Sequence, residues 1–257
     1  IVPDLKTTYY KSIENIPAIL WNTLLGNRGA FNWETLKLYE NIFSSNLLEE
    51  HNWSFHYFII SDAKDIPIVA TFFTVGRIKN DMLFSASVSH QTEHSRMGNP
   101  YHQTSKAMLM GSVATEGNHL YINKSSKDWK EAITLLLKVI VVTQEKADAE
   151  VLLIRDMNAE DAELNEILMN QGFLKSYLPD NHILQNLTEW HDTASFLGLF
   201  NHRKRQYLKQ KVFNCKDFFE VQISNSLVDN LEYLYRLYRN VCSKSVEINT
   251  FPLPIKF

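Results

Sequence analysis

The sequence predicts an α+β fold, with a mixed, mostly antiparallel sheet flanked by helices. Two observations carry this prediction. Three β-prone segments separated by short polar turns follow one another between residues 55 and 88, which is the pattern of an antiparallel meander. From residue 119 onward, short apolar runs alternate with segments of helical period, which is typical of a strand–helix–strand crossover.

Composition sets the broad class of the protein. The chain has 257 residues, 45% hydrophobic and 21% charged, which is the balance of a globular protein with one large domain or two small ones. Its net charge of -3 gives no overall attraction to nucleic acid or to an anionic membrane. The two cysteines, Cys215 and Cys242, favour reduced thiols and a cytoplasmic location. The longest apolar run, 132–142, is too short to span a bilayer, so we expect no integral membrane contact.

Two helices are predicted before the meander. Apolar residues at helical spacing indicate a helix over 16–25, with Pro17 in its first turn and Gly26 beyond its end. Asn32 is a suitable N-cap for a second helix, which runs from 33 to 43. The strands that follow are expected at 55–60, 66–78 and 82–88.

The middle of the chain is predicted as a long loop and then a crossover. Residues 89–118 show no clear period, so we expect a loop with a short helix around 105–113, and loops of this length are often functional. A short strand at 119–122 precedes the strongest helix pattern, 129–146, which begins after Ser126 or Asp128.

The last part of the chain predicts the end of one unit and the start of another. A buried strand at 151–154 leads to an amphipathic helix over 159–170, closed by Gly172 at its C′ position. The remaining elements are expected as hairpin arms at 173–177 and 183–187, a basic helix at 194–211, a strand at 218–223 and a helix at 228–238. The second unit begins without finishing, and both ends of the chain read as cuts in a longer protein.

One short motif suggests a metal site. His90, Glu93 and His94 have the spacing of an inverted zinc-protease signature. On a helix, two imidazoles four residues apart share a face, and the glutamate would polarise a metal-bound water. The segment stays polar and meets Gly98 and Pro100, whereas a protease helix needs an apolar face beyond His94. A zinc hydrolase is therefore a remote alternative, and we expect no metal.

Two stretches carry a resemblance to a known family. Residues 154–173, IRDMNAEDAELNEILMNQGF, resemble the last helix of the GCN5-related N-acetyltransferase (GNAT) fold, which closes on Gly-Phe. Residues 199–223, LFNHRKRQYLKQKVFNCKDFFEVQI, resemble the opening of the second half of the FemAB-type, BioF2-like branch, of peptidoglycan-biosynthesis type. The resemblance extends over about 12–250. It implies a GNAT-like domain over 1–190 and the truncated start of a second over 191–257.

The resemblance implies an enzyme that transfers an acyl or aminoacyl group from an acyl-CoA-type donor to an amine. An aminoacyl-tRNA is the alternative donor, and the acceptor is a small-molecule, lipid or cell-wall amine. Relatives usually cradle the donor pyrophosphate in a glycine-bearing turn before the long helix. Here that turn has no glycine, and Lys124, Ser125 and Ser126 are the candidate ligands, with a solvated helix start as the alternative. The family's general-acid tyrosine position holds Leu168.

The departures from the family pattern favour a first half that is degenerate for donor binding, so a non-catalytic GNAT-like binding module is the alternative function. Acylation of an amine needs a base and donors to an oxyanion. The candidate catalytic residues are Tyr101 and His102 in the long loop and Glu116 just before a strand, where its carboxylate would face the splay of the sheet. The alternative for Glu116 is a turn acid.

The concentrated positive charge lies near residues 202–211. Arg203 and Arg205 are candidate ligands for a phosphate-bearing donor, whether coenzyme A or the acceptor end of tRNA. A solvated helix face is the alternative. Tyr207 is the only interleaved aromatic, so the sequence gives no support for contact with a whole tRNA.

Overall fold

A single mixed sheet organises the protein. The computed structural model describes residues 4–177, 190–221, 223 and 230–257. In these ranges, six strands form a sheet of order β1–β2–β3–β4–β6, and β5 pairs separately with β3. All pairs are antiparallel except β4 with β6. The strands are β1 (Lys6–Tyr10), β2 (Ser54–Ser61), β3 (Pro67–Lys79), β4 (Thr104–Met110), β5 (Leu120–Ile122) and β6 (Val151–Leu153).

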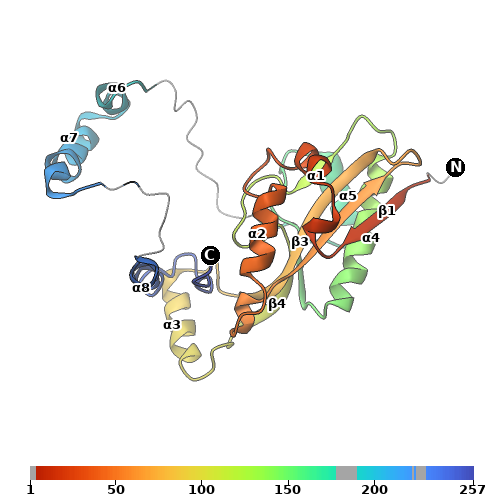
Figure 1. The fold of residues 1–257 in the computed structure, drawn as a ribbon, viewed down its shortest axis with the longest axis horizontal. Helices are drawn as coiled ribbons and strands as arrows, with labels where there is room; N and C mark the ends of the chain where they lie inside the picture. The colour runs from red at the N-terminus through yellow and green to blue at the C-terminus, as the bar shows by residue number, and fades with distance from the viewer. Residues whose placement is uncertain (1–3, 178–189, 222, 224–229) are drawn as a thin grey trace. The chain divides into compact units, whose positions relative to one another are not determined.

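Helices cover both faces of the sheet (Figure 1). The helices of the described ranges are α1 (Ala18–Leu24), α2 (Trp33–Ile42), α3 (Ala86–Arg96), α4 (Trp129–Lys146), α5 (Ala162–Asn170), α6 (Thr193–Gly198), α7 (His202–Lys211) and α8 (Leu231–Cys242). The same described ranges also contain three 3-10 helices: η1 (Ile13–Asn15), η2 (Glu49–His51) and η4 (Phe213–Phe218). The fold is α+β with a mainly antiparallel sheet flanked by helices, as predicted.

Strands β2 and β3 are hydrophobic on both sides because each of their faces is covered. Tyr57 and Phe72 belong to one core with residues of α1 and α2, whereas Phe58 and Phe73 belong to a second core with residues of α4. Burying one such side chain stabilises the fold by roughly 1.5–3 kcal/mol. The alternation of side chains along a strand thus supplies both cores from the same two strands.

Local sequence signals set several helix boundaries. The Asn32 side chain accepts a hydrogen bond from the Thr35 N–H at 2.8 Å, which confirms it as the N-cap of α2. Helix α4 has the predicted bounds. Helix α5 ends at Gln171 as C-cap, so Gly172 is at C′, and its φ of 89° is the left-handed conformation that favours glycine there.

The prediction for residues 82–118 is wrong. The predicted strand at 82–88 and long loop after it are replaced by helix α3, a turn and β4. Helix α3 buries Ser89 and Arg96 rather than apolar residues. Arg96 is 6% exposed and its Nη2 lies 2.6 Å from Asp81 Oδ1. Because charge rather than an apolar stripe holds the helix, its sequence shows no hydrophobic period.

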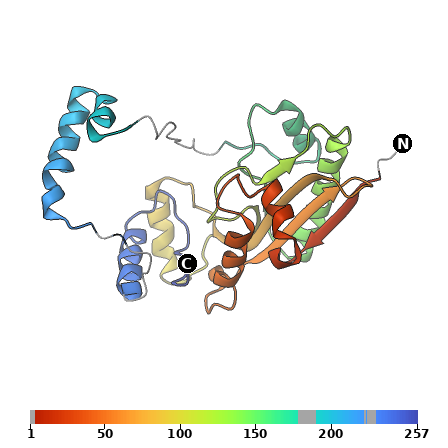
Figure 2. The same cartoon turned by 45° about the horizontal axis from the view of Figure 1, so that its top comes forward.

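The chain divides into two compact units. Ile1–Leu174 and Glu232–Phe257 form the first, and Lys175–Leu231 form the second. The predicted boundary at 190/191 therefore differs from this division, because most of α8 and the residues after it belong to the first unit (Figure 2). Among the described residues, no helix has the length and apolar character needed to cross a membrane.

The chain after α5 differs in detail from its predicted elements. The predicted helix 194–211 is two helices, α6 and α7, and Phe218 ends η4 instead of starting a strand. Residues 173–177 form no strand. The predicted arm at 183–187 lies outside the described residues.

Candidate functional site

A cavity of about 1250 Å³ lies between the sheet and the C-terminal half of α4. It opens where β1 ends, because β1 pairs with β2 only from Tyr57 to Ser61. Residues Ser54, Phe55 and His56 of β2 therefore line the cavity along an edge that β1 does not cover. Other parts of its wall come from α2, η2, β3 and β4.

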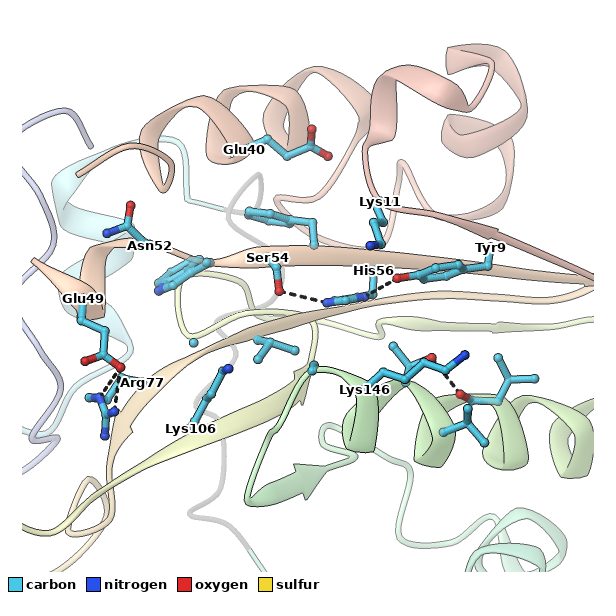
Figure 3. A pocket seen from close by; sticks show the side chains of 18 of the residues that line it. Tyr9, Lys11, Glu40, Glu49, Asn52, Ser54, His56, Arg77, Lys106 and Lys146 are labelled. Atoms are coloured by element: carbon cyan, nitrogen blue, oxygen red, sulfur yellow. Dashed lines mark hydrogen bonds and ion pairs between the residues drawn. The ribbon is translucent and has the colours of Figure 1, made fainter. Parts of the chain in front are cut away.

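A chain of polar side chains crosses the cavity (Figure 3). The Tyr9 hydroxyl lies 2.7 Å from His56 Nδ1, and the Ser54 hydroxyl lies 2.9 Å from His56 Nε2. Ser54 and His56 reach each other because side chains two residues apart on a strand share a face. His56 is 6% exposed, whereas Ser54 is exposed. The imidazole thus links a phenol to a hydroxyl that solvent and ligands can reach.

Burial determines the charge of these groups. Burial, with a smaller contribution from the positive charge of Lys11, lowers the pKa of His56 to about 4. The imidazole is therefore neutral at pH 7, with one nitrogen that donates and one that accepts. Burial also raises the pKa of Tyr9, so its phenol stays protonated and can donate or accept.

Positive charge is concentrated around the cavity. Five basic and two acidic side chains line it, in a chain whose net charge is -3. Both acids already have partners. Glu49 pairs with Arg77 at 2.6 Å, and Glu40 accepts hydrogen bonds at 2.6–2.7 Å from the Ser12 hydroxyl, the Ile13 N–H and the Tyr57 hydroxyl. The cavity therefore favours an anionic ligand. The basic residues are Lys11, Arg77, Lys106, Lys138 and Lys146.

The lysines of this rim are available for a ligand. Within the described ranges, none of the four has a salt-bridge partner. Figure 3 shows Lys11 above His56, Lys106 below the strand and Lys146 on α4, so they approach the cavity from separate elements. An anion bound among them would gain charge-assisted hydrogen bonds.

An apolar wall adjoins the charged rim. It includes Val75 of β3 with Val139 and Val142 of α4. Trp53 also lines the cavity, and its ring stacks on Phe43 with centroids 3.4 Å apart. A Cβ atom at Gly76 would lie 2.6 Å from Trp53 Cδ1, so this close approach requires glycine. The cavity can therefore accept an apolar group beside an anionic one.

The structure separates the predicted catalytic residues. Tyr101 donates a hydrogen bond to Glu50 Oε2 at 2.9 Å, and the guanidinium carbon of Arg77 lies 4.9 Å from its ring centroid, so it adjoins the cavity rim. His102 follows it, and its carbonyl accepts a hydrogen bond from Arg96 Nε at 2.9 Å. Glu116 is exposed on the loop between β4 and β5. None of the three lines the cavity.

The predicted donor-binding residues lie in two other places. Lys124 Nζ is paired with Asp161 Oδ2 at 2.5 Å, which ties the turn before α4 to the start of α5. Ser125 and Ser126 belong to that turn, where Ser125 N–H donates to Asn123 Oδ1 at 3.2 Å and Ser126 Oγ accepts from Asp128 N–H at 3.3 Å. The remaining two candidates, Arg203 and Arg205, belong to α7 of the second unit.

Strands β4 and β6 pair only as far as Leu109 and Leu153, and beyond these residues side chains bridge the space between the two segments. Arg155 donates to the carbonyls of Ser112 and Thr115 at 3.0 and 3.1 Å. His119 is fully buried, with Nε2 at 3.0 Å from Thr115 Oγ1 and Nδ1 at 3.3 Å from Asp156 Oδ2, outside hydrogen-bond geometry. Burial would raise the pKa of Asp156, but its contact with His119 and the charge of Arg155 outweigh burial and lower it. This gap is occupied by the protein itself.

In the structure, the glutamate of the motif His90, Glu93, His94 belongs to a cluster of polar side chains that holds α3. His90 and His94 do lie on one helix, α3. Glu93 Oε1, however, accepts from Lys79 Nζ at 2.7 Å, Arg96 Nη1 at 2.6 Å and Asn249 Nδ2 at 2.9 Å. Burial would raise the pKa of Glu93, but these hydrogen bonds lower it. Over the described ranges, no three His, Cys, Asp or Glu side chains are grouped so as to hold a metal.

Sequence reasoning missed the residues of the cavity. The alternation in Ser54-Phe-His-Tyr57 indicates that the serine and the histidine share one face of a strand, but the predicted strand began at residue 55 and left Ser54 out. Tyr9, Lys106 and Lys146 come from separate elements, and only the folded sheet brings them together.

The comparisons with known proteins give weak similarities. No family model and no curated protein matches the chain. A solved structure of a probable acetyltransferase aligns with a TM-score of 0.37 and 10% identity, over 70% of this chain and 97% of that one. A mutant of the BH1408 protein from Bacillus halodurans aligns with a TM-score of 0.37 and 9% identity, over 70% and 98%. Likenesses this weak carry no argument about function.

Proposed function

We propose that the protein is an N-acyltransferase that moves an acyl group from an acyl-CoA-type donor to an amine. The observation that carries the proposal is the cavity, where a cationic rim, an apolar wall and a neutral imidazole lie together. Each of these matches one requirement of the reaction. The resemblance of residues 154–173 and 199–223 to the GNAT superfamily, and to its FemAB and BioF2-like branch, supports the same assignment, although a fold alone does not specify a function.

The cavity offers the interactions that an acyl thioester needs. The rim lysines would bind the donor phosphates, and the wall of Val75, Val139 and Val142 would receive the acyl chain. A neutral imidazole at His56 can accept a proton. Tyr101 would hold Arg77 in place at the rim through their cation–π contact.

Binding and turnover can be measured on the full chain. We expect acyl-CoA to raise the melting temperature, because a ligand of the native state stabilises it by mass action. Free thiol should then appear when amines are added. No shift and no thiol release with any acyl-CoA would contradict the proposal.

Neutralising the rim tests where the donor binds. The double substitution Lys106→Gln, Lys146→Gln should weaken acyl-CoA binding about tenfold and reduce its salt dependence, since each lost charge contact is worth roughly 0.5–1 kcal/mol. The matched control is Lys64→Gln, Lys244→Gln, at exposed positions outside the cavity. Isothermal titration at two salt concentrations gives the comparison. Equal affinity in both double variants would place the donor elsewhere.

A binding module without chemistry is the second candidate function. Two observations favour it: Arg155 bridges the space between β4 and β6, and Lys124 of the predicted donor turn is already paired with Asp161. The two candidates differ in turnover. Saturable ligand binding with no thiol release across a panel of amines would favour the binding module.

A further inference from the structure

We propose that Ser54 is an acyl-accepting nucleophile, with His56 as its base and Tyr9 as the residue that positions His56. This inference deepens the proposed function and depends on it only for the identity of the acyl donor. It concerns side chains of the cavity that neither the sequence motifs nor the family resemblance singled out.

The distances fit an activated nucleophile. Ser54 Oγ lies 2.9 Å from His56 Nε2, within the range of about 2.6–3.2 Å for a nucleophile and its base. The serine is exposed at the cavity, whereas the imidazole behind it is 6% exposed. Substrate can therefore reach the hydroxyl while the base stays shielded from bulk water.

Tyr9 supplies the third position of the arrangement. Its hydroxyl lies 2.7 Å from His56 Nδ1, so it can accept a hydrogen bond from Nδ1–H and leave the Nε2 lone pair for Ser54. The Tyr9 ring stacks on His56 and on Phe58, with centroids 5.9 and 5.2 Å away. The phenol and the imidazole therefore hold each other in orientation, as the third group of a catalytic triad does.

The cavity also provides positive charge beside the reacting groups. Lys11 is close enough to His56 to affect its titration, and Figure 3 shows it above the imidazole. Lys106 of β4 also lines the cavity and lies below β3 in the same view. An ammonium group in this place would stabilise the oxyanion that forms at an acyl carbon bound to Ser54.

The reaction proceeds in two balanced steps. Ser54 Oγ attacks the thioester carbonyl as its proton moves to His56 Nε2, and the C–S bond then breaks. The leaving thiolate takes that proton and departs as free thiol, which leaves an acyl ester on Ser54. An amine next attacks the ester carbon, the C–O bond to Ser54 breaks, and one amine proton passes through His56 to Ser54 Oγ.

Mass spectrometry of the full chain tests the covalent step. The protein is mixed with acetyl-CoA and, separately, with p-nitrophenyl acetate, and then quenched in acid for intact mass and peptide mapping. We expect one acetyl group on Ser54 from either reagent and none at this site in Ser54→Ala. His56→Gln should slow acylation by about 100-fold, the lower end for general-base catalysis. Ser87→Ala, at an exposed serine of α3, is the control and should react like the wild type.

Tyr9 is tested through the histidine that it positions. Tyr9→Phe should slow acylation by about tenfold, and the ¹⁵N shifts of the His56 ring should move from the Nδ1–H toward the Nε2–H tautomer. A general loss of stability would leave the tautomer unchanged. Unchanged acylation and an unchanged tautomer would overturn the role of Tyr9.

The outcomes separate this inference from the proposed function. Thiol release with amines but no acyl-Ser54 from either reagent would overturn the inference and leave direct transfer. Acylation of Ser54 by the p-nitrophenyl ester, without any binding of acyl-CoA, would support the inference and contradict the proposed function. Equal acylation of the wild type and of Ser54→Ala would overturn the inference. Urea unfolding of each variant verifies that the variant protein is folded.

Discussion

A buried imidazole at the cavity governs how stability depends on pH at the scale of single residues. His56 contacts hydroxyl groups on both sides, and no carboxylate hydrogen-bonds to it among the described residues. Burial therefore opposes its protonation, and its pKa falls to about 4 in the folded protein. In the unfolded chain this histidine has its ordinary pKa of 6.5, so the unfolded chain binds a proton first as the pH falls.

The free energy of unfolding should therefore fall between pH 6.5 and pH 4 and be fully retained above that window. A pKa difference of this size corresponds to about 3 kcal/mol. His56→Gln should remove most of this pH dependence, as measured by urea unfolding at pH 7 and pH 4.5. The control is His94→Gln, at an exposed position, which should behave like the wild type. An unaltered pH dependence in His56→Gln would contradict the assignment.

Helix α3 is anchored by a buried ion pair. Asp81 Oδ1 and Arg96 Nη2 are 2.6 Å apart, and both side chains are about 5% exposed or less. Burial would raise the pKa of Asp81, but hydrogen bonds from Arg96 and Asn249 outweigh it and lower that pKa. Buried pairs of this kind are costly to break, because the remaining charge loses its partner.

Arg96→Met should lower the free energy of unfolding by about 3–5 kcal/mol, because it leaves Asp81 buried and unpaired. Arg239→Met, at an exposed position of α8, is the matched control and should change stability by less than about 0.5 kcal/mol. Chemical denaturation measures both. A loss of less than about 1 kcal/mol in Arg96→Met would show that this ion pair does not hold the helix.

At the scale of the whole molecule, the chain leaves its first unit after residue 174 and returns to it at residue 232. The returning segment inserts Asn249 into the charged cluster of α3. Its amide nitrogen donates to Asp81 Oδ2 at 2.7 Å, and its amide oxygen accepts from Lys79 Nζ at 3.0 Å. These contacts join residues about 170 positions apart, so the buried amide helps to close a very long loop, together with the contact between His51 Nε2 and the Pro252 carbonyl at 2.7 Å.

Asn249→Ala should release the segment that follows α8. It leaves the polar groups of Asp81 and Lys79 with fewer partners, which costs about 1–3 kcal/mol. Hydrogen exchange should then rise in residues 243–257 and in α3 together. Asn240→Ala, at an exposed position in α8, should leave exchange in both segments unchanged. Faster exchange in only one of the two would contradict the coupling.

The sequence by itself determined the elements with strong local signals. The apolar period of α4, the N-cap at Asn32 and the left-handed Gly172 each depend on residues within a few positions. The hydrophobic runs of β2 and β3 likewise identified the centre of the sheet. These signals fix the fold class because each hydrophobic face requires a covering layer.

Only the tertiary structure decided helix α3 and the cavity. The helix depends on partners such as Asp81 and Asn249, which lie outside its own sequence. The cavity combines Tyr9, His56 and Lys146 from three distant segments. Secondary-structure propensity and hydrophobic periodicity in the sequence indicate apolar faces. Hydrogen bonds and charge contacts between distant segments produce no periodic pattern in the sequence. The polar sites of this protein are therefore set by the packing of its elements.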